Sequence, residues 1–186
     1  MRRSPWFLSR ALLLLSAIAL LMHPAIVRPA CADELDDDAA AALRSLYEGS
    51  SAARALGEKA VAVLVFPNIV KAGFLFGAQF GEGTLFRGGR KVANYRSVAG
   101  SYGFQAGVQT FGYAMFLMTN AAVQYLDTSG GWELGVGPSI VVVDVGVARN
   151  LTTTTVQSDV YAFVFDQKGL MAGVGIQGSK ITRVNH

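Results

Sequence analysis

Apolar positions recur at helical spacing in one stretch of the chain, residues 38–57. This stretch is rich in alanine, it ends near Gly57, and its larger apolar residues are Leu43, Leu46, Tyr47, Ala53 and Leu56. We therefore expect an amphipathic helix over 38–57. The acidic run 33–38 precedes it, and we expect this run to be solvated and to complement the helix dipole.

From residue 60 onward the pattern changes to one typical of β-structure. β-branched and aromatic residues alternate with small ones, and all 21 glycines lie between Gly49 and Gly178. Apolar or alternating runs predict strands at 61–66 (ending at Pro67), 74–80, 84–87, 90–95, 156–165 and 170–176. The run 101–119 predicts one or two strands, and the run 132–147 predicts a strand interrupted at Gly137-Pro138.

Shorter signals predict the connections between these strands. The pair Gly88-Gly89 predicts a hairpin turn, because glycine adopts positive φ without strain. Asp166 to Gly169 has the Asp-first, Gly-fourth pattern of a type I turn, and residues 120–126 favour a short helix.

Together these elements predict an α+β fold. An N-terminal amphipathic helix would pack on a mostly antiparallel, Gly-rich β-sheet or barrel-like core of about seven to nine strands. A chain of 186 residues favours one domain, and it is long enough to bury a core without disulfides or metal.

The first 32 residues have the pattern of an export signal. Arg2, Arg3 and Arg10 precede an apolar run over 11–22, which has the length of a signal-peptide core and is short for a membrane span. The sequence Ala-Cys-Ala at 30–32 predicts cleavage after Ala32. We therefore expect a signal peptide over 1–32 and a single domain over 33–186 in the periplasm of a bacterial cell envelope, or alternatively a lipoprotein anchored through Cys31.

The charge distribution argues against a nucleic-acid partner. The net charge is +3, but four of the 16 basic residues lie in the first 32, which leaves 12 against 13 acidic residues in the remainder.

The expected mature chain contains few of the residue types that commonly act in catalysis. Beyond residue 32 there is no Cys and the only His is His186, so neither a Ser-His-Asp triad nor a His-rich metal site can be built. Asp144 lies inside an apolar run, where a carboxylate could act in acid catalysis. The simpler interpretation is that its side chain faces solvent or is hydrogen-bonded.

The G-x-G-x-x-G pattern at 173–178 has too few residues after it for a dinucleotide-binding unit. We expect no catalytic residue, no metal and no cofactor.

Two groups of residues combine cations with aromatic side chains. One group surrounds the predicted hairpin at 84–95, and the other lies in the apolar segment 71–76. Cations beside exposed aromatic rings suit an anionic lipid headgroup, although a solvated hairpin tip would also carry such charges. The candidate lipid-binding residues are Lys71, Phe74, Phe76, Arg87, Arg90, Lys91 and Arg96.

The order and spacing of several short motifs resemble the SYLF domain family. The motifs are AVAVLVFP at 60–67, KAGFLFG at 71–77, GEG at 81–83, SYGFQAG at 101–107, LMT at 117–119, VYAF at 160–163 and KGLMAGVGIQGS at 168–179. The resemblance extends over about 40–181. The family is shared by a yeast actin-patch protein, an animal phosphoinositide-binding protein, plant endosomal proteins and many exported bacterial proteins.

This resemblance implies a non-enzymatic lipid-binding protein. Lys71 matches the Lys that precedes Gly-Phe in the family, and the helix over 38–57 matches its N-terminal helix. We expect the apolar face of that helix to dock on a membrane while Lys71 and the hairpin at 87–96 contact headgroups. In a bacterial envelope the ligand would be a phospholipid or an acyl group in a groove. The alternative is an envelope scaffolding protein that binds a partner protein through its β surface.

Overall fold

A computed structural model describes residues 30–128, 132–133, 140–144 and 158–184 of the chain. The fold described below is that of the unit Cys31–His186. The signal segment expected over 1–32 lies outside the described residues as far as residue 29. Among the helices that the structure describes, none has both the length and the apolar character needed to cross a bilayer.

Two consecutive helices, α2 (Ala30–Gly49) and α3 (Ser51–Gly57), occupy the region expected to form one helix over 38–57. The division occurs at Ser50, which has an extended backbone (φ −142°, ψ 108°) and whose side chain accepts a hydrogen bond from the Ala53 N–H. A serine in this position caps a new helix. The acidic run over 33–38 forms the first turns of α2, and Asp33, Glu34, Asp37 and Asp38 are exposed there as expected, whereas Asp36 is half-buried.

Among the described residues, six strands form one sheet. They are β1 (Ala62–Gly73), β2 (Phe76–Arg87), β3 (Arg90–Leu117), β4 (Trp132–Glu133), β5 (Ile140–Asp144) and β6 (Val160–Val184). Neighbouring strands are antiparallel except β5, which runs parallel to β6. The expected short helix is present between β3 and β4 as α4 (Asn120–Thr128).

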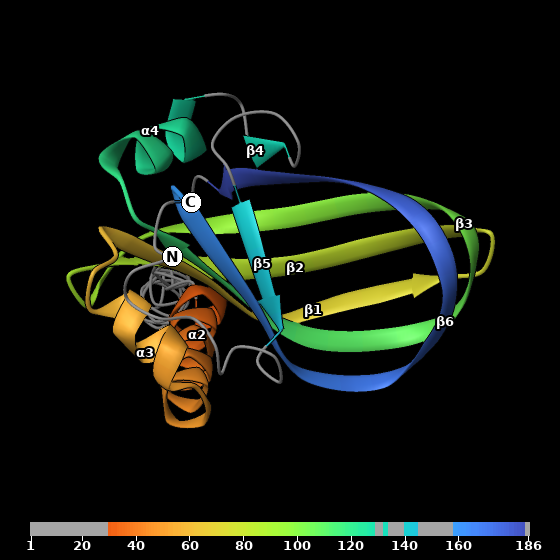
Figure 1. The fold of residues 1–186 in the computed structure, drawn as a ribbon, viewed down its shortest axis with the longest axis horizontal. Coiled ribbons are helices and arrows are strands. Elements are labelled where there is room, and N and C mark those ends of the chain that lie inside the picture. Colours follow the sequence, from red (N-terminus) through yellow and green to blue (C-terminus); the bar gives the residue numbers. More distant parts are fainter. Residues whose placement is uncertain (1–29, 129–131, 134–139, 145–157, 185–186) are drawn as a thin grey trace, which may run out of the picture. The chain divides into compact units, whose positions relative to one another are not determined.

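The two longest strands each cross the sheet twice. The first part of β3 pairs with β2 as far as Tyr102, and the last part pairs with β1 from Gly107 onward. β3 therefore bends around the tip of the β1–β2 hairpin, and β6 follows the same bend on its outside (Figure 1). Because β3 and β6 each contribute two segments, the six described strands make eight strand segments across the sheet. This agrees with the expected seven to nine strands and confirms the α+β class.

Bulges allow β1 and β6 to continue through positions where the sequence predicted a strand end or a turn. The expected turn at 166–169 is wrong: β6 continues through it, with Asp166 and Gln167 together opposite Phe111, and Asp166 has a φ of 51°. Similarly, β1 continues past Pro67 in a bulge that leaves Phe66 and Pro67 opposite Gly83. A bulge accommodates the proline, which cannot donate a ladder hydrogen bond. The expected Gly88-Gly89 turn is confirmed, with φ values of 56° and 74°.

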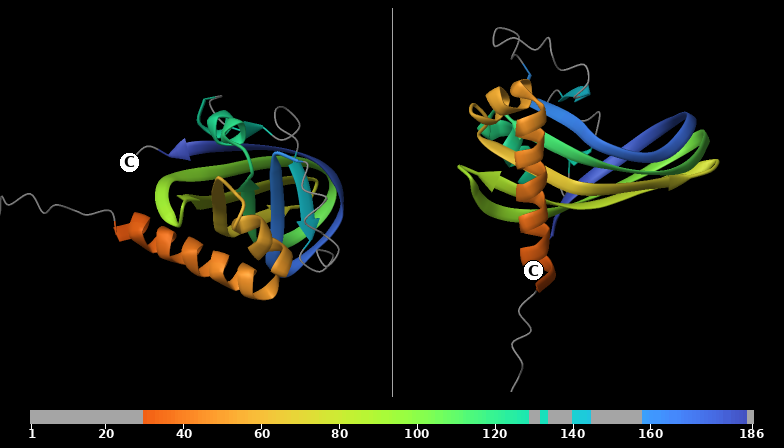
Figure 2. Two further views of the ribbon diagram at one scale, coloured as in Figure 1. Left: turned by 60° about the vertical axis from the view of Figure 1, so that its left-hand side comes forward. Right: turned by 90° about the horizontal axis from the view of Figure 1, so that it is seen from below.

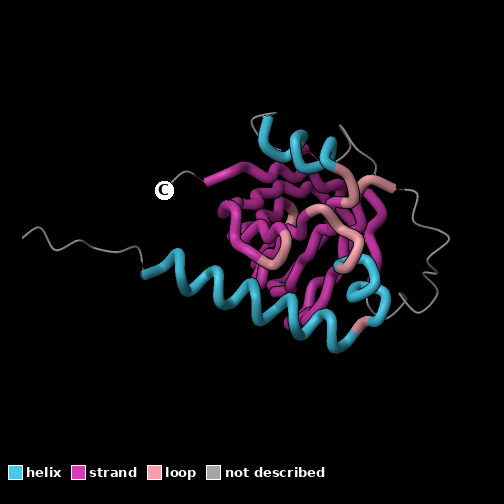
Figure 3. The backbone as a smooth tube through the Cα atoms, turned by 90° about the vertical axis from the view of Figure 1, so that its left-hand side faces the viewer, coloured by secondary structure: helices cyan, strands magenta, loops and turns pink. Residues whose placement is uncertain are grey.

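The sheet has a buried cluster on each face. On the inner face of the curled sheet, residues of β1, β2, β3 and β6 pack with Ala122 and Leu126 of α4. On the outer face, Ala39 and Leu46 of α2 and two residues of α3 pack on β1, β3 and β6. Figures 2 and 3 show α2 outside the curled sheet and α4 at its opposite side.

We predict that Gly83→Ala destabilises the fold, because a Cβ at this position would lie 2.4 Å from the Val65 carbonyl oxygen and 2.6 Å from the Phe66 ring. Overpacking of this kind costs about 1–3 kcal/mol of unfolding free energy. Gly100→Ala is the matched control, since a Cβ there meets nothing within 4 Å. Urea unfolding of both variants checks the prediction, and equal midpoints would contradict it.

Candidate functional site

The seven predicted lipid-binding residues fall in separate places. Phe74 and Phe76 lie at the turn between β1 and β2, whereas Arg87, Arg90 and Lys91 lie at the turn between β2 and β3. These turns are at opposite ends of β2, about 36 Å apart along an extended strand of this length. They therefore do not form one contact surface.

Two cations of the β2–β3 turn bind other parts of the fold. The Arg87 guanidinium donates a hydrogen bond to the Asn120 side chain of α4 (2.9 Å), and Lys91 forms an ion pair with Asp36 of α2. Asp36 also accepts hydrogen bonds from Thr84 Oγ1 (2.8 Å) and Asn94 Nδ2 (2.9 Å). The turn thus ties α2 and α4 to the sheet.

The environment of Asp36 favours its ionised form. Burial by itself raises the pKa of this carboxyl, but the hydrogen bonds from Lys91, Asn94 and Thr84 and the charge of Lys91 outweigh burial and hold the pKa below its usual value. A lowered pKa means that the ionised carboxylate stabilises the native state above the pKa of the unfolded chain. This stability is lost as the pH falls through the native pKa.

We predict that Asp36→Asn lowers the free energy of unfolding at pH 7 by about 1–2 kcal/mol, because hydrogen bonds to a charged group contribute on this scale. The difference from the wild type should shrink below about pH 4, where the unfolded carboxyl becomes protonated. Asp37→Asn, at the exposed neighbouring position, is the control. Denaturation at a series of pH values checks both variants, and a difference that does not change with pH would contradict the role of the charge.

The apolar face of the N-terminal helices is part of the core. Ala39, Leu46, Ala53 and Leu56 are all at most 4% exposed and pack on the outer face of the sheet. The expectation that this face docks on a membrane is therefore wrong, because docking would require the helices to leave the core.

A different apolar surface remains uncovered, at the end of the sheet where β3 and β6 bend. Phe74 is 69% exposed, Phe76 74% and Leu170 88%. We call this the distal apolar surface, and its members are Val70, Phe74, Leu75, Phe76, Phe80, Val98, Tyr102, Val108 and Leu170. Contiguous exposed apolar side chains of this kind mark an interaction site.

Strand register brings these residues together on the outer face. Val70 pairs with Phe80 and Phe80 with Val98, while Val108 pairs with Leu170. The rings of Phe76 and Tyr102 pack in a tilted arrangement, with their centroids 5.2 Å apart and an interplanar angle of 47°. At the opposite end of the sheet, α2 and α3 cover this same outer face. The bends of β3 and β6 extend beyond those two helices (Figures 1 and 2).

Cations accompany the distal apolar surface. The segments that form this end of the sheet, 70–80, 98–110 and 168–180, contain Lys71, Lys168 and Lys180 and no Asp or Glu. Lys168 and Lys180 pair with Thr110 and Val98 on the outer face. Arg96 lies next along this face, where it binds Glu82 (2.8 Å) and lies over the Phe80 ring (5.6 Å to the centroid).

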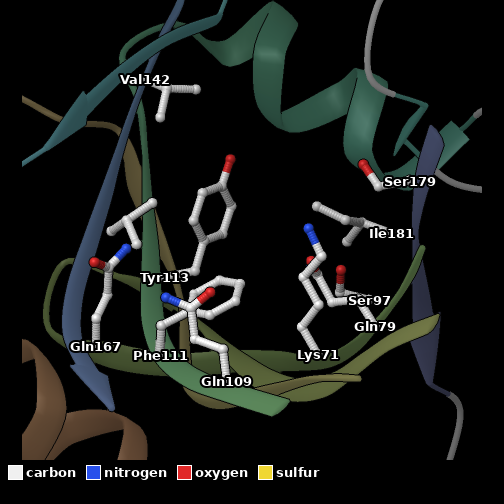
Figure 4. A pocket seen from close by; sticks show the side chains of 11 residues that line it. Lys71, Gln79, Ser97, Gln109, Phe111, Tyr113, Val142, Gln167, Ser179 and Ile181 are labelled. Atoms are coloured by element: carbon white, nitrogen blue, oxygen red, sulfur yellow. The ribbon is translucent and has the colours of Figure 1, made fainter. Parts of the chain in front are cut away.

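Lys71 lies on the opposite, inner face of the sheet. It lines a cavity of about 290 Å³ together with Gln79, Gln109 and Tyr113 (Figure 4). Lys71 and the phenylalanines Phe74 and Phe76 are therefore close in sequence but belong to different surfaces.

Within the described ranges, no group of three or more His, Cys, Asp or Glu side chains could hold a metal ion. The backbone of Asp144 pairs with Val164 in β6, and the position of its side chain lies outside what the structure describes.

A family model matches the C-terminal part of the chain. The family model described as "Ysc84: Las17-binding protein actin regulator" matches residues 98–186, which run from the middle of β3 through α4, β4, β5 and β6. Among curated proteins, the comparison found no significant match.

Proposed function

We propose that the protein binds phospholipid and associates with membranes of the cell envelope. Residues 98–186 match the model of the Ysc84 (SYLF) family, which is generally a non-enzymatic binding domain, and this match supports the proposal. The distal apolar surface carries the proposal. It would contact the bilayer in place of the N-terminal helix.

The shape of the distal end suits insertion into a bilayer surface. Phe74, Leu75 and Phe76 form the tip of the β1–β2 hairpin, and Tyr102 flanks them. Transfer of a Phe or Leu side chain out of water is worth about 1.5–3 kcal/mol when burial is complete. Aromatic side chains are also well suited to the interface between headgroups and acyl chains.

The charges of the distal end favour anionic phospholipids. Three lysines and no carboxylate occur in the segments that form it. Each basic residue near an anionic membrane contributes about 1 kcal/mol, which salt weakens. Lys168 and Lys180 on the outer face are the ones that would meet headgroups when the tip inserts, and Arg96 lies further from the tip.

The proposed location follows from the N-terminal segment. Export and cleavage after Ala32 would release the domain into the periplasm, and lipid modification of Cys31 would instead anchor it. In either case the domain would meet bacterial phospholipids.

We predict that the double variant Phe76→Ser, Leu170→Ser loses binding to vesicles of phosphatidylethanolamine and phosphatidylglycerol. Both side chains are largely exposed, so their replacement should leave the fold intact while vesicle affinity falls more than tenfold. Val92→Ser, at an exposed position near the β2–β3 turn, is the control and should bind as the wild type does. Vesicle flotation at low and high salt measures the binding.

Equal flotation of the wild type and the double variant would contradict docking through this surface. Failure of the wild type to float with any vesicle, together with a stoichiometric partner protein that co-purifies and is lost in the double variant, would favour the scaffolding alternative.

A further inference from the structure

The cavity on the inner face of the sheet has a lining unlike the apolar clusters around it. β1, β2, β3, β5 and β6 all contribute to it, and its volume of about 290 Å³ is at the small end of the range for ligand pockets. It lies on the face opposite the distal apolar surface, so the proposed membrane contact does not use it.

Polar side chains dominate one wall and the floor of this cavity. Three amides (Gln79, Gln109 and Gln167) and two serine hydroxyls (Ser97 and Ser179) line it together with the ammonium of Lys71. In Figure 4, Lys71, Gln79 and Ser97 lie together on one side, and Gln109 and Gln167 lie on the other. Gln79 is only 8% exposed and Ser97 only 4%. Buried groups of this kind favour a polar occupant, water or ligand, over an apolar one.

Ser179 gives a second, independent indication of an occupant. Its hydroxyl oxygen is buried and has no hydrogen-bond partner among the residues that the structure describes. An unsatisfied buried hydroxyl destabilises a fold, and a ligand oxygen or hydroxyl in the cavity would satisfy it.

The remaining wall is aromatic and aliphatic. Phe111 and Tyr113 present their rings to the cavity, with Val164 and Ile181 nearby. Burial raises the pKa of Tyr113 to about 12, so its hydroxyl keeps its proton at neutral pH and can donate a hydrogen bond. A ring face beside many hydrogen-bonding groups suits a compact ligand with one apolar face and several hydroxyls.

We propose that this cavity binds a sugar acid, a monosaccharide-sized ligand with several hydroxyls and one carboxylate. The amides and hydroxyls would bind the ligand hydroxyls, and Lys71 would bind the carboxylate.

The charge of Lys71 favours a carboxylate over a phosphate as the anionic group of the ligand. Among the described residues that line the cavity, Lys71 is the only Lys or Arg, and none carries a carboxylate. One ammonium balances a carboxylate, whereas a phosphate monoester carries about −1.5 to −2 charges at pH 7 and needs more donors. A long acyl chain would make no hydrogen bonds with the amides, and a divalent cation would find no acidic ligand among the described lining residues.

Titration of the protein with D-glucuronate, followed by calorimetry and by the side-chain amide NMR signals of glutamine, tests the proposal. Glucuronate should bind and shift the signals of Gln79, Gln109 and Gln167, and neutral glucose should bind about tenfold more weakly. Lys71→Gln should reduce glucuronate affinity about tenfold and remove the preference over glucose. Lys59→Gln, which makes the same charge change at an exposed position just after α3, should leave glucuronate affinity unchanged.

Ser179→Ala separates binding from folding. Because it removes an unsatisfied hydroxyl, this variant should unfold at the same temperature as the wild type or higher, while glucuronate affinity falls about fivefold. The double variant Phe76→Ser, Leu170→Ser should bind glucuronate normally even if vesicle binding is lost, so the two proposals fail separately. Absence of binding, equal binding of glucose, tighter binding of glucose 6-phosphate, or an unchanged affinity in Lys71→Gln would each overturn the assignment.

Discussion

The double passage of β3 and β6 around the tip of the β1–β2 hairpin determines the rest of the structure. Each long strand has to bend by itself where most sheets would use a loop. The bend is possible because β3 has glycines at 103 and 107 with φ values of 147° and 139°, a region that other residues rarely adopt. At Gly107 the approach is also close, since a Cβ would lie 2.1 Å from the Leu170 carbonyl oxygen.

This bend separates two ends of one sheet that have different environments. Near the β2–β3 turn, α2 and α3 cover the outer face, α4 packs on the inner face, and Asp36 and Arg87 connect helices to strands. Toward the bend the helices end, so the outer face continues as exposed apolar side chains and the inner face as a polar cavity. The candidate sites are therefore the parts of the two sheet faces that no helix covers.

Features set by local chemistry could be predicted from the sequence, and features set by distant contacts could not. Gly88 and Gly89 predicted their turn because positive φ is a property of the residue itself. In contrast, the partners of Asp36 lie 48 to 58 residues away, so nothing near the acidic run indicated its role. The candidate site was predicted in part: Phe74 and Phe76 belong to the distal apolar surface, but Tyr102, Val108 and Leu170 join them only through the register of β3 and β6. The amphipathic helix was identified correctly, but a helical pattern alone does not tell whether its apolar face meets a membrane or a sheet.

The segment of β1 between its bulge and the hairpin tip should be sensitive to insertions and deletions, because its two faces have different chemistry. Between the bulge and the hairpin tip, Ile69 and Lys71 face the inside of the sheet while Val70 and Ala72 face the outside. Because side chains alternate with a period of two, adding or removing one residue in this short segment would exchange the two sets. Lys71 would then lie among the exposed aromatic rings, and Val70 would fill the polar cavity. Length variation during evolution should therefore be tolerated far better at the β2–β3 turn than between Asn68 and Gly73. In that segment, the insertion or deletion of a single residue would exchange the side chains of the two faces.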